Sequence, residues 1–176
     1  CKRDVTADSC DKNPGTFNAF QYGGFLCGTL TLCSDLLKGF LPVFLYRCGA
    51  AAGADMGMAF VLAAPVYGHI LPIFHRFCGG KGIAVSFGCL LGLLPEARPL
   101  LVLASAFLFF SLVVRITPNY HRTIAAYLVS VVGMILFVPD AAVSLGFALM
   151  AALVIGKFLC SPERKELCEV GMAWKH

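Results

Sequence analysis

Two histidines, an arginine, a lysine and four glycines crowd into residues 68–82, between two strongly apolar stretches. Within this segment Gly79, Gly80 and Gly82 surround Lys81. Glycine leaves backbone N–H groups accessible and lysine adds a positive charge, so this composition suits a phosphate group. The segment is not a Walker A loop, because that motif requires Ser or Thr after its lysine. A tight turn with a lysine anchored among lipid headgroups is an equally good interpretation.

Three other side chains have chemistry that such a segment would use. Histidine as a residue type changes charge near neutral pH, so His69 suits a base or a donor to phosphate; capping a helix end is the alternative. Asp35 and Lys38 are three residues apart in an apolar stretch, which places them on one face of a helix. Charged groups within a membrane usually face the interior of a bundle. The pair therefore predicts either support for a site or a structural ion pair that closes the bundle.

The composition predicts the elements that must position these residues. Of the 176 residues, 59% are hydrophobic and 14% are charged, whereas a soluble domain has about 25% charged residues. We expect a single all-α, polytopic integral membrane domain over residues 1–176, since the apolar stretches are continuous and show no alternation of period two. About six hydrophobic segments are expected, at 23–47, 51–67, 83–95, 99–114, 123–138 and 141–159. The nine cysteines include no C-x-x-C pair, so no metal site is predicted.

The distribution of basic residues predicts the orientation. If the polar start is cytosolic and every apolar segment crosses, eleven of the fourteen lysines and arginines fall on the cytosolic side. This places three segments on one face: a loop at 1–22, the phosphate-loop candidate at 68–82 and a tail at 160–176. The chain opens on Cys1 rather than Met, which leads us to expect a truncated N-terminus.

Three motifs occur in a recognisable order. Residues 13–18 read Asn-x-Gly-x-x-Asn, residues 35–39 read Asp-x-x-Lys-Gly, and residues 68–84 read Gly-His-x-x-Pro-x-Phe-x-x-Phe-x-Gly-Gly-Lys-Gly-x-Ala. In this order and spacing the chain resembles the acyl-phosphate:glycerol-3-phosphate acyltransferases, the bacterial PlsY family. The likeness covers residues 4 to about 160.

The chain also departs from the family pattern. Gln21 stands where the family has an arginine, and Val85 where it has a threonine. The Ser-Gly before the first asparagine is replaced by residues 11–12, Asp-Lys. We expect the family's first helix to have been lost in the N-terminal truncation. A third family motif, His-x-x-Asn followed by Glu, is unclear here; one register puts Lys157 and Cys160 in its first two places and Glu169 in the last.

The resemblance implies transfer of an acyl group from acyl-phosphate to the 1-hydroxyl of glycerol-3-phosphate, giving 1-acyl-glycerol-3-phosphate and phosphate. It implies no cofactor, a lipid bilayer as partner, no nucleic acid, and a bacterial inner membrane with a cytosolic active face. The expected catalytic residues are His69, Lys81 and Asn18. The expected substrate-binding residues are Asn13, Gly15, Asn18, Gly79, Gly80, Lys81 and Gly82. The expected supporting residues are Asp35, Lys38, Gly68 and Glu169.

Two other interpretations stay open at this stage. One is a small membrane transporter or binding protein for an organic phosphate, which basic loops and intramembrane charges would also serve. The other is a catalytically weakened relative, suggested by Gln21 and the unclear third motif. A different acyltransferase class uses His-x-x-x-x-Asp, which no histidine of this chain matches.

Overall fold

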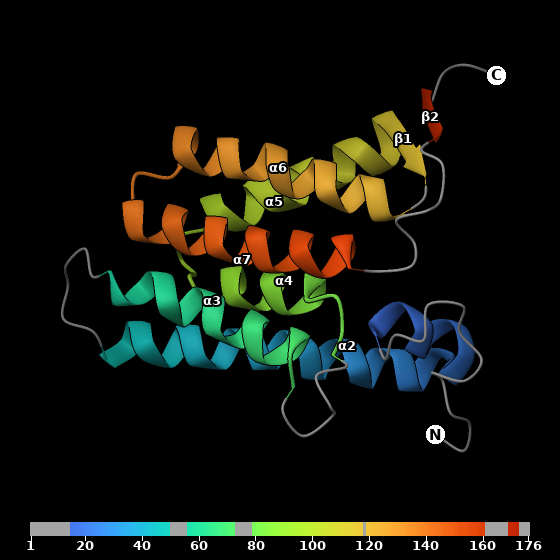
Figure 1. The fold of residues 1–176 in the computed structure, drawn as a ribbon. Helices are drawn as coiled ribbons and strands as arrows, with labels where there is room; N and C mark the ends of the chain where they lie inside the picture. The colour runs from blue at the N-terminus through green and yellow to red at the C-terminus, as the bar shows by residue number, and fades with distance from the viewer. Residues whose placement is uncertain (1–14, 50–55, 73–78, 118, 161–168, 173–176) are drawn as a thin grey trace.

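The structure, a computed structural model, describes residues 15–49, 56–72, 79–117, 119–160 and 169–172. These residues form six α-helices, one π-helical turn and a two-stranded antiparallel sheet. In chain order the elements are α2 (Thr16–Gly49), α3 (Gly57–Ile70), α4 (Ile83–Leu91), α5 (Arg98–Leu108), η2 (Phe109–Val113), β1 (Val114–Thr117), α6 (Asn119–Phe137), α7 (Ala141–Leu159) and β2 (Glu169–Met172). Figure 1 shows the helices side by side, with α2 along one side, α5 and α6 along the other, and α3, α4 and α7 between them.

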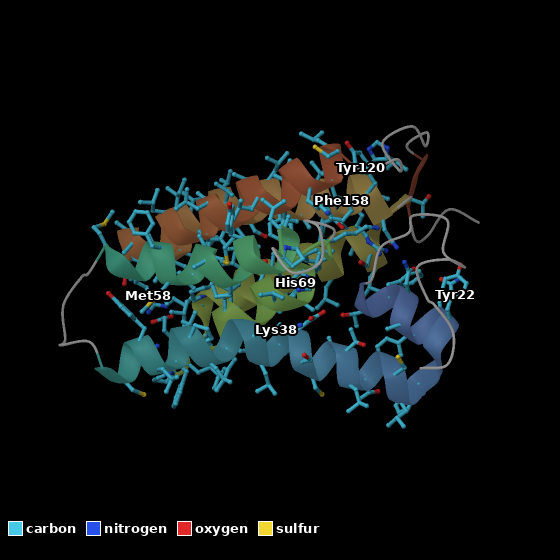
Figure 2. All side chains as sticks on the ribbon, turned by 60° about the horizontal axis from the view of Figure 1, so that its bottom comes forward. Tyr22, Lys38, Met58, His69, Tyr120 and Phe158 are labelled. Carbon is cyan, nitrogen blue, oxygen red and sulfur yellow. The ribbon has the colours of Figure 1, made fainter. Side chains whose placement is uncertain are left out.

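Three of the described helices, α2, α6 and α7, are long and apolar enough to cross a membrane. Large apolar side chains such as Phe25, Leu30, Phe60 and Ile135 point outward from the bundle, where lipid rather than water would surround them. The predicted all-α membrane bundle is confirmed. Figure 2 shows Met58 near one end of α3 and His69 near the other, with Lys38 on α2.

Glycines bring α2 and α4 into direct backbone contact. A Cβ added at Gly39 would lie 2.2 Å from the Val85 carbonyl oxygen, and one at Gly88 would lie 2.2 Å from the Leu36 carbonyl oxygen. Small residues at such crossings allow close packing without a large hydrophobic driving force, as is common between membrane helices. The contact fixes the start of α4 beside the part of α2 that carries Asp35.

Several element boundaries differ from the sequence expectation: α3 extends to Ile70 and α6 begins at Asn119, and three further differences bear on the fold. The segment 1–22 was expected to be a loop, but residues 16–22 are helical; the turn signal at 13–15 precedes a helix rather than breaking one. The expected segment 83–95 yields a helix that ends at Leu91, because Gly92 and Pro95 terminate it. The segment 99–114 becomes α5 and η2 and passes into strand β1.

The small sheet was not expected from the sequence. Strand β1 pairs with β2 in antiparallel register, with Thr117 opposite Glu169. The two segments are distant in sequence, so no short turn between them predicts the pairing. Their pairing fastens part of the tail to the residues that lead into α6.

Candidate active site

A cavity of about 710 Å³ opens at one end of the bundle. Successive helices run in opposite directions, so the starts of α2, α4 and α6 meet the ends of α3, α5 and α7 there. Its polar lining comprises Thr16, Asn18, Gln21, Asp35, His69, Lys81, Asn119, Arg122 and Thr123. Its apolar lining includes Leu32, Ile83, Phe87, Phe107 and Phe158.

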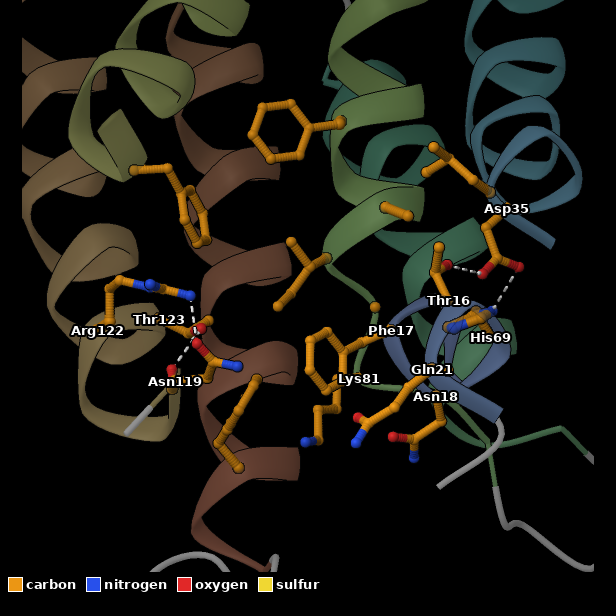
Figure 3. Close-up of a pocket in the computed structure, with 18 of the residues that line it drawn as sticks. Thr16, Phe17, Asn18, Gln21, Asp35, His69, Lys81, Asn119, Arg122 and Thr123 are labelled. Carbon is orange, nitrogen blue, oxygen red and sulfur yellow. Dashed lines mark hydrogen bonds and ion pairs between the residues drawn. The ribbon is translucent and has the colours of Figure 1, made fainter. Parts of the chain in front are cut away.

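Asp35 links three parts of the chain on one wall of this cavity. It is buried, and its Oδ2 accepts a hydrogen bond of 3.1 Å from the Thr16 hydroxyl. Its Oδ1 lies 3.1 Å from Lys38 Nζ and 3.6 Å from His69 Nδ1. Figure 3 shows the contacts of Asp35 with Thr16 and His69. A buried carboxylate is tolerated only when such partners replace its hydration. The ion pair predicted from the Asp35–Lys38 spacing is therefore present.

Gly79 and Gly80 lie so close to His69 that a larger residue would not fit at either position. A Cβ at Gly79 would lie 2.0 Å from the His69 carbonyl oxygen, and a Cβ at Gly80 would lie 2.2 Å from His69 Nε2. Gly82, with φ of 83°, adopts the left-handed conformation that precedes α4. Gly79 and Gly80 are buried and do not line the cavity, whereas Gly82 does. His69 thus lies between Asp35 and the glycine backbone, as a residue that orders the segment would.

Lys81 brings a positive charge to the cavity. Its Nζ lies 5.3 Å from the centre of the Phe158 ring, which is the geometry of a cation–π interaction. Gln21 and Asn18 line the same cavity, and Figure 3 shows their side chains in the same part of the view as Lys81. The lining thus offers an ammonium group and two amides, which suits an anion.

A second cation faces the cavity from α6. Arg122 Nη2 donates a hydrogen bond to Asn119 Oδ1, and the Thr123 hydroxyl donates to the Asn119 carbonyl at 2.8 Å. The Nε atom of Arg122 is buried and has no hydrogen-bond partner among the described residues. The sequence analysis counted Arg122 only among the basic residues of the cytosolic side. The spacing of Asn119 and Arg122, three residues apart directly after Pro118, could have indicated that the two side chains meet at the start of a helix.

The structure brings together six of the predicted site residues: Gly15, Asn18, Asp35, His69, Lys81 and Gly82 all line the cavity. Asn13 lies outside the described residues. Gly68 is helical and, like Lys38, is not part of the lining. Glu169 lies on β2, where its backbone pairs with Thr117.

The cavity is amphiphilic. Lys81 and Arg122 provide two cations, while Ile83, Phe87 and Phe107 give an apolar wall. This arrangement suits an anionic group joined to an apolar chain.

Comparison with known proteins agrees with this geometry. Residues 1–164 match the family model described as glycerol-3-phosphate acyltransferase. The chain is 47% identical over 85 residues to the glycerol-3-phosphate acyltransferase of Cupriavidus taiwanensis, covering 47% of this chain and 42% of that protein. It is 40% identical over 107 residues to the enzyme of Ralstonia nicotianae, covering 57% and 52%. The chain thus spans about half the length of the curated relatives it matches.

The fold is also similar to a solved structure. The crystal structure of PlsY, an integral membrane glycerol 3-phosphate acyltransferase, in its glycerol 3-phosphate form matches with a TM-score of 0.73 and 23% identity. The match covers 89% of this chain and 75% of that one. At this identity the likeness concerns the fold, while the family model covers most of the sequence. The chain therefore belongs to the glycerol-3-phosphate acyltransferase family.

Proposed function

We propose that the protein transfers an acyl group from acyl-phosphate to the 1-hydroxyl of glycerol-3-phosphate. The products are 1-acyl-glycerol-3-phosphate and phosphate. The observation that carries this proposal is the amphiphilic cavity, in which Lys81 and Arg122 face the same space as the apolar wall of Ile83, Phe87 and Phe107. Both substrates carry phosphate, which the two cations would bind, and one carries a long apolar chain, which the apolar wall would contact.

The proposed reaction requires no covalent bond between the protein and either substrate. The acceptor hydroxyl attacks the acyl carbon, the bond from that carbon to the phosphate oxygen breaks, and phosphate leaves with the electron pair and takes up the proton of the hydroxyl. Lys81, with Asn18 and Gln21 beside it, is placed to hold one phosphate, and Arg122 with Asn119 the other. Positioning the two substrates and neutralising charge on the leaving oxygen then supply most of the acceleration. His69, between Asp35 and Gly80, keeps Lys81 in place through the glycine segment.

The position of the site suits substrates that meet at a membrane surface. The cavity lies at one end of a bundle with three candidate spans. We place this end on the cytosolic face of a bacterial inner membrane, since the excess of basic residues falls on that side. An acyl-phosphate would then reach the apolar wall from the bilayer, and glycerol-3-phosphate would arrive from the water.

One observation favours a second candidate, a weakened relative that binds an organic phosphate. Gln21 lines the cavity beside Lys81 (Figure 3), at the position where the family pattern has an arginine. The site therefore has one cation fewer than that pattern. Slow turnover with retained glycerol-3-phosphate binding would distinguish this candidate.

Product analysis tests the proposal. Membranes that contain the full chain are supplied with isotopically labelled glycerol-3-phosphate and either palmitoyl-phosphate or palmitoyl-CoA, and the lipids are analysed by mass spectrometry. We expect labelled 1-palmitoyl-glycerol-3-phosphate with palmitoyl-phosphate and little with the thioester, relative to empty-vector membranes. Labelled product with palmitoyl-CoA alone would contradict the proposed donor, and none with either would contradict the enzyme.

A further inference from the structure

Two phenylalanine rings separate the cavity from the core of the bundle. Phe87 on α4 and Phe107 on α5 both line the cavity, and their ring centres are 5.8 Å apart. Neither helix contributes lining residues deeper than these rings. Leu90 and Leu103, one turn farther into the bundle, are fully buried in the hydrophobic core and do not line the cavity. The ring pair is therefore the inner boundary of the cavity.

The core supports Phe107 from behind. Its ring meets that of Tyr127 on α6 edge to face, with the ring centres 6.0 Å apart, and Tyr127 stacks on Phe147 of α7 at 5.9 Å. Tyr127 and Phe147 are both fully buried. Aromatic contacts of this kind add to the stabilisation from burial, and a close-packed core accommodates an added methyl group only at a cost. Phe107 thus has little room to yield to a substrate.

The cavity is too shallow to enclose a long acyl chain. Lys81 precedes α4, and Phe87 lies four residues beyond the start of that helix at Ile83, about 6 Å along its axis. An acyl chain in a membrane spans about 15 Å, half the thickness of the hydrocarbon core. A chain whose phosphate lies at Lys81 and Arg122 therefore meets the rings with its first few carbons, and the rest must turn aside.

The side of the cavity between α2 and α5 offers a path for the rest of the chain. Leu32 of α2 and Phe107 of α5 line the cavity from two helices that both pack against α4 but, among the described residues, make little contact with each other. Exposed apolar side chains, such as Leu30 and Leu108, lie on these helices close to the two lining residues in sequence. A chain that leaves between α2 and α5 would enter apolar surroundings.

We propose that the Phe87–Phe107 pair selects acyl chains that are unbranched near the acyl carbon and directs the remainder between α2 and α5 into the bilayer. Total chain length then has little effect, because the later carbons are surrounded by lipid before and after binding. The occupant of the apolar end is the acyl chain of an acyl-phosphate, since Lys81 and Arg122 present two cations to the same cavity. The inference rests on the proposed function and defines which donors it would accept.

Two isomeric donors test the ring pair. The full chain in proteoliposomes is supplied with glycerol-3-phosphate and either 4-methylhexadecanoyl-phosphate or 15-methylhexadecanoyl-phosphate. We expect kcat/KM to be at least about tenfold lower for the 4-methyl isomer, the order for forcing one methyl group into a close-packed site. Lauroyl-, palmitoyl- and stearoyl-phosphate should differ by less than about fivefold, because only their distal carbons differ. Equal use of the two isomers by the wild type would overturn the proposal.

Removing the ring should remove the discrimination. In Phe107→Ala the space of the ring becomes available to a branch methyl, so the two isomers should be used within about twofold of each other. Phe107→Leu removes less volume and should give an intermediate ratio, which keeps the test valid if Phe107→Ala does not fold. Phe109→Ala is the matched control, since Phe109 lies on η2 and does not line the cavity. A ratio that stays at the wild-type value in the Phe107 variants would contradict the role of the ring.

Binding of unreactive analogues separates this inference from the proposed function. The 4-methyl and 15-methyl isomers of methylhexadecylphosphonate cannot transfer an acyl group, and calorimetry in detergent measures their affinity for the purified protein. We expect the 15-methyl isomer to bind at least about tenfold more tightly in the wild type and about equally in Phe107→Ala. This preference without turnover of any donor would support the ring pair and contradict the acyltransferase. Turnover without a preference in binding or in kcat/KM would support the acyltransferase and overturn the ring pair.

Discussion

His69 and Asp35, which come from different helices, lie with Nδ1 and Oδ1 3.6 Å apart at the wall of the cavity. The same carboxylate binds Thr16 and Lys38, and the other nitrogen of His69 faces Gly80. The contact thus connects α2 and α3 to the backbone that leads into Lys81. It gives an acidic residue a structural role in a site for which we propose phosphate-bearing substrates.

Replacing Asp35 should therefore disrupt the site without altering its shape. Asp35→Asn keeps the side-chain volume but removes the charge that pairs with Lys38 and His69. We expect the acceptor-dependent rate to fall by at least about tenfold, the scale for losing hydrogen bonds to a charged group. Lys38→Met is the comparison variant, and because the Lys38 side chain is 57% exposed, a smaller loss is expected. Equal losses in the two variants would show that the ion pair, and not the contact with His69, is what matters.

The Phe158 ring should affect the binding of phosphate through Lys81. Phe158→Leu keeps an apolar side chain but removes the aromatic face below the ammonium group. A rise of about fivefold in the KM for glycerol-3-phosphate is expected from the strength of cation–π interactions. Steady-state kinetics would measure it, with Phe109→Leu as control, since Phe109 is 48% exposed and does not line the cavity. An unchanged KM in Phe158→Leu would show that the Phe158 ring does not affect phosphate binding through Lys81.

A third cation at the cavity should strengthen the site. Gln21→Arg places a guanidinium group beside Lys81, at a position already in the lining. We expect the KM for glycerol-3-phosphate to fall by about tenfold, the order expected for a charge-assisted bond to phosphate. Gln21→Leu, which matches the original side chain in size but has no polar group, should raise the KM. If arginine and leucine had the same effect, the side chain at 21 would not face the phosphate.

The contact between α2 and α4 should limit stability. A methyl group at Gly88 would lie 2.2 Å from the backbone oxygen of Leu36, so the helices must separate to admit it. We expect Gly88→Ala to reduce the free energy of unfolding by about 1–3 kcal/mol, as overpacking commonly does. Denaturant unfolding in detergent would measure this, and Gly156→Ala, whose Cβ meets open space, should change it little. A fully stable Gly88→Ala protein would show that the two backbones are farther apart than the structure has them.

The sequence was sufficient to predict the features that depend only on residues close together in the chain. The apolar run at 141–159 predicted α7 with the bounds that the structure has, because length and hydropathy alone decide such a helix. The spacing of Asp35 and Lys38 predicted their ion pair, because residues three apart lie on the same face of a helix. The glycines at 68–82 were expected to offer backbone N–H groups to phosphate, but Gly79 and Gly80 are buried against His69 and do not line the cavity.

Features that depend on distant segments were not predictable. The place of Arg122 depends on the packing of α6 against the other helices, and the start of α6 adjoins a strand pair formed with residues 169–172. The sequence does not reveal the helix at 16–22, because polar and apolar residues mix there. Its stabilising partners, Asp35 and Gly28, lie farther along α2, beyond Gly24, whose φ of 80° interrupts the helix. In both cases tertiary contacts outweigh local preference.

The most direct test of the account is phosphate release from palmitoyl-phosphate by the full chain in membranes, with and without glycerol-3-phosphate, for the wild type and for Lys81→Met. Lys81→Met keeps an unbranched side chain over Phe158 and removes the charge. We expect release that depends on glycerol-3-phosphate in the wild type, reduced at least about a hundredfold in the variant, the upper range for losing a charged contact to phosphate. Release that depends on the acceptor but is equal in both proteins would contradict the assignment of Lys81, and release that ignores the acceptor would contradict the acyltransferase itself.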